Sequence, residues 1–105
     1  MSDFKTVARA DEIAPGEMKQ VRLGRKRLAI VNVGGEYFAI DDTCTHEEAS
    51  LSEGELYDDI VECPLHGAAF NVRTGAVEAF PAVVALGTYQ LRIVDDEVQV
   101  GPQND

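Results

Sequence analysis

Short runs of alternating or β-branched residues, separated by turn residues, recur along the whole chain. Such runs are typical of half-buried strands, because successive side chains of a strand point to opposite faces of its sheet. We expect strands at Phe4–Val7, Met18–Leu23, Leu28–Val33, Tyr37–Ile40, Ile60–Glu62, Ala69–Val72, Tyr89–Val94 and Val98–Val100. The pattern therefore predicts an all-β fold built from antiparallel strands.

Turn residues mark where this chain reverses direction. Gly34-Gly35 separates two expected strands and is a strong hairpin signal, since both residues can adopt positive φ. Asp95-Asp96 is a weaker signal of the same kind. The one helical candidate lies around Asp11-Glu12-Ile13, where Pro15-Gly16 ends it within a turn or two.

Two segments, from Asp42 to Glu55 and from Pro64 to Ala68, do not fit a strand and adjoin the candidate ligands. The chain contains two cysteines and two histidines, arranged as Cys44-Thr45-His46 and, after sixteen further residues, Cys63-Pro64-Leu65-His66. Thiolate and imidazole are the usual protein ligands of zinc and iron. Two Cys-His pairs with no Cys or His left over therefore indicate a metal site.

Two other interpretations of these four residues have to be weighed. A lone buried Cys or His often serves only packing or hydrogen bonding, which two matched pairs make improbable. A structural Cys2His2 zinc site usually groups its cysteines together and its histidines together. Here each loop supplies one of each, which favours an asymmetric binuclear centre with both thiolates on one iron and both imidazoles on the other. Zinc remains the minor alternative.

The spacing of Cys44, His46, Cys63 and His66 resembles the cluster motif of the Rieske proteins. The likeness continues through Gly67, the stretch from Ala69 to Gly75, and Phe80-Pro81-Ala82, which resembles the family's proline loop. The resemblance implies a single Rieske domain over residues 1–105, an antiparallel β-sandwich with a small cluster-binding subdomain at roughly 42–82. It also implies one [2Fe-2S] cluster held by the four residues.

Among Rieske proteins the chain resembles the free-standing ferredoxins of bacterial aromatic-ring-hydroxylating dioxygenase systems. That resemblance implies a one-electron carrier between a flavin-dependent reductase and a terminal oxygenase, in pathways of aromatic hydrocarbon catabolism. It implies no catalytic residues, so the chain would be an electron-transfer component and not an enzyme. The alternatives are a Rieske small subunit of a larger redox enzyme such as nitrite reductase, and a structural or sensing metal domain.

Three positions depart from the Rieske proteins of high reduction potential. Leu65 stands where those proteins have an extra cysteine, and Ala68 and Phe70 stand where they have hydroxyl donors. Hydrogen bonds to the sulfurs of a cluster stabilise its reduced state, and acidic residues beside it, here Glu47 and Glu48, oppose reduction. We expect a potential near the low end of the Rieske range, about −150 mV.

Charge is distributed unevenly along this chain of net charge −10. Nine acidic residues and no Lys or Arg lie between Asp41 and Glu62, whereas five basic residues lie between Lys19 and Arg27. The acidic balance argues against nucleic acid and anionic membranes as partners. The acidic stretch is either a solvated loop or, as we expect, a docking face for basic patches on redox partners.

The remaining sequence signals concern location and local structure. The N-terminus lacks an export signal, and no run of 18 apolar residues occurs, so we expect a cytoplasmic protein outside the membrane. We also expect a monomer. Gly67 is expected to allow close approach of the backbone to the cluster, and Arg73-Thr74-Gly75 is expected to form a hairpin turn.

Overall fold

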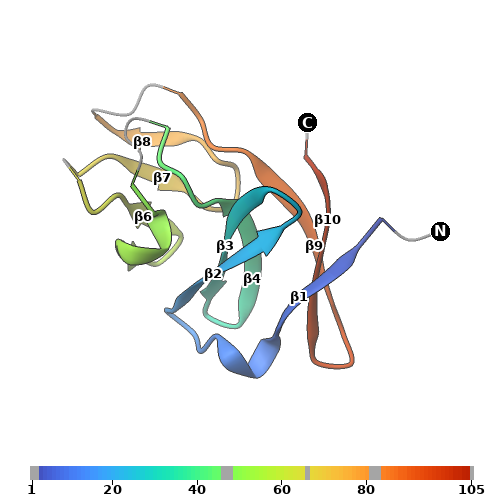
Figure 1. Ribbon diagram of the computed structural model, residues 1–105. Helices are drawn as coiled ribbons and strands as arrows, with labels where there is room; N and C mark the ends of the chain where they lie inside the picture. Colours follow the sequence, from blue (N-terminus) through green and yellow to red (C-terminus); the bar gives the residue numbers. More distant parts are fainter. Residues whose placement is uncertain (1–2, 46–48, 66, 81–83, 105) are drawn as a thin grey trace.

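A computed structural model describes residues 3–45, 49–65, 67–80 and 84–104, which fold into two antiparallel sheets (Figure 1). The strands are β1 (Lys5–Arg9), β2 (Met18–Leu23), β3 (Lys26–Val33), β4 (Glu36–Asp41), β5 (Glu55–Tyr57), β6 (Ile60–Glu62), β7 (Ala69–Asn71), β8 (Val77–Ala79), β9 (Thr88–Val94) and β10 (Glu97–Gln103). The larger sheet has the order β1-β10-β9-β4-β3-β2, and the smaller has the order β5-β6-β7-β8. The predicted all-β antiparallel fold is confirmed.

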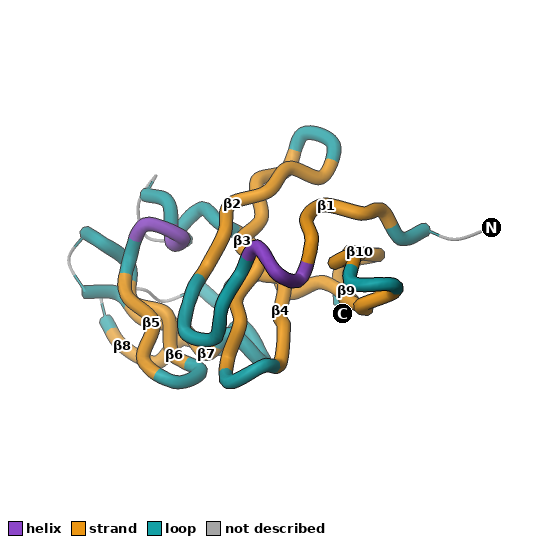
Figure 2. Tube along the Cα trace, turned by 90° about the horizontal axis from the view of Figure 1, so that it is seen from below, coloured by secondary structure: helices purple, strands orange, loops and turns teal. Residues whose placement is uncertain are grey.

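Strand β3 lies between the two hydrophobic cores of the molecule. Leu28 and Ile30 point into one core, whereas Ala29 and Val31 point into the other. A strand covered on both faces has apolar residues at successive positions and not at alternate ones. This explains the uninterrupted run Leu-Ala-Ile-Val in the sequence. Figure 2 shows β3 and β4 between the small sheet on one side and β1, β9 and β10 on the other.

One core, which we call the ligand-side core, joins the two sheets and contains both cysteines. Its buried members are Ala29, Val31, Ile40, Cys44, Ala49, Leu51, Val61, Cys63, Ala68, Phe70, Val72 and Leu86. The second core lies on the other face of the large sheet, where Ile13 packs against side chains of β2, β3, β9 and β10. The segments that carry the cysteines are therefore packed directly against the framework sheet.

Both predicted hairpin turns are present. Gly34 and Gly35 have φ of +59° and +101° and join β3 to β4. Asp95 and Asp96 have φ of +51° and +66° and join β9 to β10. Aspartate tolerates this left-handed region better than most residues, which explains why it can replace glycine here. The helical candidate is a single 3-10 turn at Ala10–Glu12, as short as predicted.

Two strands were missing from the sequence prediction. Strands β5 and β8 each have three residues and contain a glutamate, whereas the equally short β6 was indicated by its β-branched pair Ile60-Val61. Glu55, which we assigned to a loop, begins β5, and a 3-10 turn at Leu51–Glu53 precedes it. Among the described residues, no helix is long and apolar enough to cross a membrane.

The predicted turn at Arg73-Thr74-Gly75 joins β7 to β8, and Arg73 also connects the two sheets. Its guanidinium lies 2.9 Å from a carboxylate oxygen of Glu36 and 3.2 Å from one of Asp59. These carboxylates raise the pKa of Arg73, and its guanidinium stacks over the Phe38 ring at 4.9 Å. Arg73 therefore has a structural role beyond the turn itself.

Candidate metal centre

Cys44 and Cys63 lie in the same ligand-side core, although 18 residues separate them in the sequence. Both side chains are almost fully buried, with exposed fractions of 3% and 2%, and no disulfide joins them. His46 and His66 lie outside the described residues. Within the described part of the chain, no three His, Cys, Asp or Glu residues are grouped as metal ligands. The structure thus brings two of the four predicted ligands together.

The backbone places both cysteines in the same local environment. The amide of Cys44 donates to the carbonyl of Ala49 at 2.9 Å, and the amide of Cys63 donates to the carbonyl of Ala68 at 2.7 Å. In each case the acceptor lies five residues after the cysteine. Each segment is therefore a closed loop that begins at a buried thiol, and the two loops repeat the same hydrogen bond.

Asp42 anchors the first loop from inside the protein. Its side chain is fully buried and accepts hydrogen bonds from Gln20 Nε2 at 2.8 Å, from the Ser52 amide at 2.9 Å and from the Ser50 hydroxyl. Its carbonyl also accepts the Leu51 amide at 2.7 Å. A buried carboxylate is stable only when its oxygens are hydrogen-bonded in this way. Asp42 therefore fixes both ends of the loop that starts at Cys44.

The same observation corrects part of the prediction for the acidic stretch. Asp42 is buried and cannot serve a docking face. Asp41 accepts hydrogen bonds from Tyr89 and the Gly87 amide, and Asp59 pairs with Arg73. Glu53, Glu55 and Asp58 are exposed, whereas Glu47 and Glu48 lie outside the described residues. The exposed acidic surface is thus smaller than the sequence suggested.

Gly54 holds the end of the first loop against the start of the second. A Cβ atom at this position would collide with the carbonyl oxygen of Glu62 and would lie 3.2 Å from Cδ of Pro64. Any larger residue would push apart the two segments that carry Cys44 and Cys63. This role could not be predicted from the sequence, because a glycine among polar residues also fits an ordinary turn.

Gly67 satisfies a different requirement in the second loop. Its φ of +73° is a conformation that residues with a Cβ adopt rarely, while the described atoms leave the Cβ position open. The backbone conformation alone thus accounts for a glycine here. Its predicted approach to a cluster remains a prediction.

The three positions at which this chain differs from Rieske proteins of high reduction potential fall into two groups. Ala68 and Phe70 are fully buried in the ligand-side core together with both cysteines. Neither side chain carries a hydrogen-bond donor. Leu65 lies on the surface with an exposed fraction of 45%. In the described segments, the two loops are held by hydrogen bonds and packing, and no disulfide joins them.

Apolar side chains are exposed on the second loop and on the segments next to residues 81–83. Leu65, Phe80 and Val84 are 45%, 83% and 58% exposed. The hydroxyl of Thr45 donates to the carbonyl of Val84 at 2.6 Å and joins the first loop to one of these segments. Pro81 and Ala82, the rest of the predicted proline loop, lie outside the described residues. We call Leu65, Phe80 and Val84 the apolar rim.

The buried donor set fits an iron–sulfur centre. Two buried cysteines that share one apolar core, each on a loop fixed by hydrogen bonds, can both be presented to one metal group. Each loop continues from its cysteine to a histidine, so imidazole ligands would enter from the same two loops. The residues present therefore suit a group bound by both thiolate and imidazole.

Comparison with known proteins agrees with this chemistry. Residues 3–90 match the family described as the Rieske [2Fe-2S] domain. The ferredoxin component of biphenyl 2,3-dioxygenase from Rhodococcus jostii (strain RHA1) is 47% identical over 94 residues, which cover 90% of this chain and 88% of that protein. The structure of a complex of reduced oxygenase and oxidized ferredoxin in carbazole 1,9a-dioxygenase contains a chain 42% identical, with a TM-score of 0.89. That alignment covers 96% of this chain and 94% of the other.

A nitrite reductase small subunit bears on the alternative function. The structure described as a putative NADPH nitrite reductase small subunit has a TM-score of 0.80, and the alignment covers 92% of this chain and 96% of that one. Its sequence identity is 19%. This likeness concerns the fold alone.

Proposed function

Because this chain belongs to the Rieske [2Fe-2S] domain family, we propose that it works as the ferredoxin component of an aromatic-ring-hydroxylating dioxygenase system. Its cofactor is one Rieske [2Fe-2S] cluster, and its role is electron transfer and not catalysis. The observation that carries the proposal is the near full-length match, at 47% identity, to a ferredoxin component of such a dioxygenase. The nitrite reductase small subunit that shares this fold is 19% identical.

We assign the cluster to Cys44, His46, Cys63 and His66. The two cysteines support the assignment through their burial and their matched loops, and the histidines complete the motif. When bound, such a cluster stores and releases a single electron. The chain's own residues exclude water from the thiols, fix the loops through Asp42 and Gly54, and leave the apolar rim exposed for contact with a partner.

The electron is delivered to a terminal oxygenase, and a flavin-dependent reductase supplies it. The apolar rim supports the first contact, since exposed apolar side chains beside a redox centre suit a brief and fast encounter. A chain of net charge −10 is poorly suited to nucleic acid or anionic membranes. We place the protein in the cytoplasm and expect it to act as a monomer.

Reconstitution tests this function. The oxygenase of biphenyl 2,3-dioxygenase would be mixed with its substrate, a flavin-dependent reductase and this chain, and hydroxylated product would be measured. Product should form with the wild type and should fall to background with Cys63→Ser, which removes a thiolate ligand. If the wild type holds its cluster, is reduced and yet passes no electrons to this or to the carbazole oxygenase, the proposed role is wrong.

A further inference from the structure

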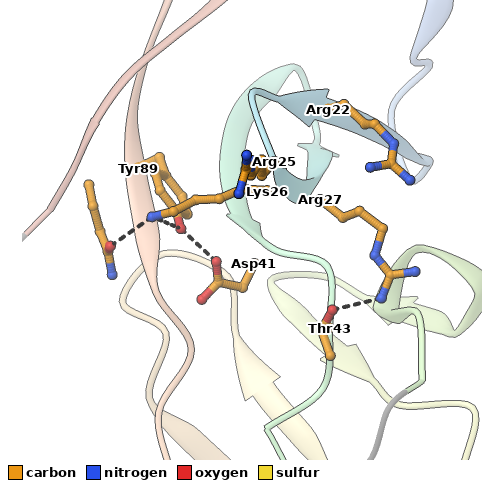
Figure 3. A pocket seen from close by; sticks show the side chains of 8 residues that line it. Arg22, Arg25, Lys26, Arg27, Asp41, Thr43 and Tyr89 are labelled. Atoms are coloured by element: carbon orange, nitrogen blue, oxygen red, sulfur yellow. Dashed lines mark hydrogen bonds between the residues drawn. The ribbon is translucent and has the colours of Figure 1, made fainter.

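A basic pocket lies at the end of the hairpin formed by β2 and β3 (Figure 3). Its volume is about 610 Å³, and its lining residues are Arg22, Arg25, Lys26, Arg27, Asp41, Thr43, Tyr89 and Gln103. Four of the nine Lys and Arg residues of the chain line this pocket, although the chain has a net charge of −10. We call the four cations the basic hairpin.

The four cations of the basic hairpin face one carboxylate, that of Asp41, in the lining of the pocket. None of its four cations forms an ion pair with a described carboxylate, although acidic residues outnumber basic ones by 19 to 9. Arg22 and Arg27 stand directly opposite each other in the ladder, where like charges repel. The carboxylate of Asp41 is engaged by Tyr89 and the Gly87 amide. Within the described residues, the positive charge of the hairpin is thus left without an ion-pair partner.

The inner wall of the pocket borders the first ligand loop. Arg27 Nη2 donates to the hydroxyl of Thr43 at 2.8 Å, and Thr43 is the residue before Cys44. Lys26 Nζ lies 3.3 Å from the Tyr89 hydroxyl and 5.1 Å from the centre of its ring. Figure 3 shows Lys26 extending toward Tyr89 and Arg27 reaching Thr43. An anionic group in this pocket would lie beside the chain that leads into the metal site.

We propose that the basic hairpin is a docking surface for a carboxylate-bearing face of a redox partner protein, an inference that rests on the proposed function. The cations are spread over both strands and the turn, and the pocket is large enough for several side chains. Such a wide spread of positive charge suits the surface of a protein better than a single small anion. An acidic partner face is repelled by the net charge of the chain, so the hairpin also sets the orientation of approach.

Oxidation of the reduced protein by ferricyanide tests this surface without requiring the natural partner. Each ferricyanide takes one electron from the protein and becomes ferrocyanide, and stopped-flow absorbance gives the second-order rate constant. The hairpin variant is Arg22→Glu/Arg25→Glu, whose side chains are exposed. The matched control is Lys5→Glu/Arg9→Glu on β1, at the opposite edge of the sheet order, with the same change in net charge. Poly-L-glutamate serves as a competitor with carboxylates in place of the partner.

At low ionic strength the hairpin variant should react roughly tenfold more slowly than the wild type, because local positive charge steers an anion. The β1 control should be slowed much less. The difference between the two variants should vanish in 1 M salt, where the Debye length is about 3 Å. Poly-L-glutamate should inhibit the wild type and the control but not the hairpin variant.

Equal rates for the two variants would overturn the docking surface and leave the arginines as ordinary protection of the edge strand β2. Inhibition by inorganic phosphate as strong as that by poly-L-glutamate, at constant ionic strength, would also overturn it in favour of a small-anion site. Both outcomes are read from rates of ferricyanide reduction by variants of this protein, and neither requires an oxygenase. The proposed function fails separately, when the wild type itself supports no oxygenase turnover in the reconstituted assay.

Discussion

At the scale of single residues, the metal site depends on side chains that shape the two loops as much as on its ligands. The amides of Cys44 and Cys63 each donate to the carbonyl of the residue five positions later in the chain. Asp42 and Gly54 hold the two loops against the rest of the protein. The cysteines could be predicted because two Cys-His pairs are a rare and specific pattern. Asp42 could not, since an aspartate within a run of acidic residues gives no sign of burial.

Replacement of Ala68 by serine should raise the reduction potential. Ala68 is fully buried in the core that contains both thiols, and a hydroxyl there could donate to the cluster and stabilise its reduced form. Ala69→Ser is the control, because Ala69 lies in β7 outside the ligand-side core. Redox titration should give a higher midpoint for Ala68→Ser alone. An unchanged or lowered potential would show that Ala68 does not explain the low value expected for the wild type.

Asp42→Ala should destabilise the protein by about 1–3 kcal/mol, because it removes the acceptor of three partly buried hydrogen bonds, from Gln20, Ser50 and Ser52. Glu53→Ala, which removes an exposed carboxylate from the same loop, is the control and should be nearly neutral. Chemical denaturation of the two variants would measure this difference. Similar stabilities would mean that the hydrogen bonds of Asp42 do not hold the loop.

At the scale of elements, strand β3 organises the molecule because it is covered on both faces. Its long apolar run, the alternating strands around it and the Gly34-Gly35 and Asp95-Asp96 turns could all be predicted from local patterns. Strands β5 and β8 could not, because each is short and contains a glutamate, a residue uncommon in strands, although each pairs with its neighbour in sequence, β6 or β7. The small sheet is therefore a series of local hairpins whose two outer strands have weak sequence signals.

Tyr89 links β9 to the end of β4 through its hydrogen bond to Asp41. We expect this link to weaken, and the protein to lose stability, at alkaline pH. Burial, and the hydrogen bond that its hydroxyl donates to Asp41 at 2.6 Å, raise the pKa of Tyr89 in the folded protein. An unfolded tyrosine ionises near pH 10. The stabilisation by neutral Tyr89 is therefore complete below about pH 10 and is lost as the pH rises toward the folded pKa. Urea unfolding at pH 8 and pH 11 should show a steeper decline for wild type than for Tyr89→Phe. Parallel declines would exclude this role.

At the scale of the whole molecule, the fold separates the tasks of an electron carrier. The large sheet supplies a rigid framework, the small sheet and its loops hold the buried thiols, and the charged surfaces lie around them. The family and the fold could be predicted from sequence because the motif and the strand pattern agree. The cluster of basic residues is visible in the sequence, but the pocket emerges only in three dimensions, where β4 and β9 complete it beside arginines of β2 and β3.

The assignment of the four ligands is the central claim, and the composition of the chain allows a direct test. His46 and His66 are the only histidines, so labelling all histidine with ¹⁵N reports on these two positions alone. The protein should contain two irons and two sulfides, and its dithionite-reduced form should give an anisotropic electron paramagnetic resonance signal with hyperfine coupling to both labelled imidazoles. Zinc without sulfide, a silent spectrum, or a signal without ¹⁵N coupling would contradict the assignment.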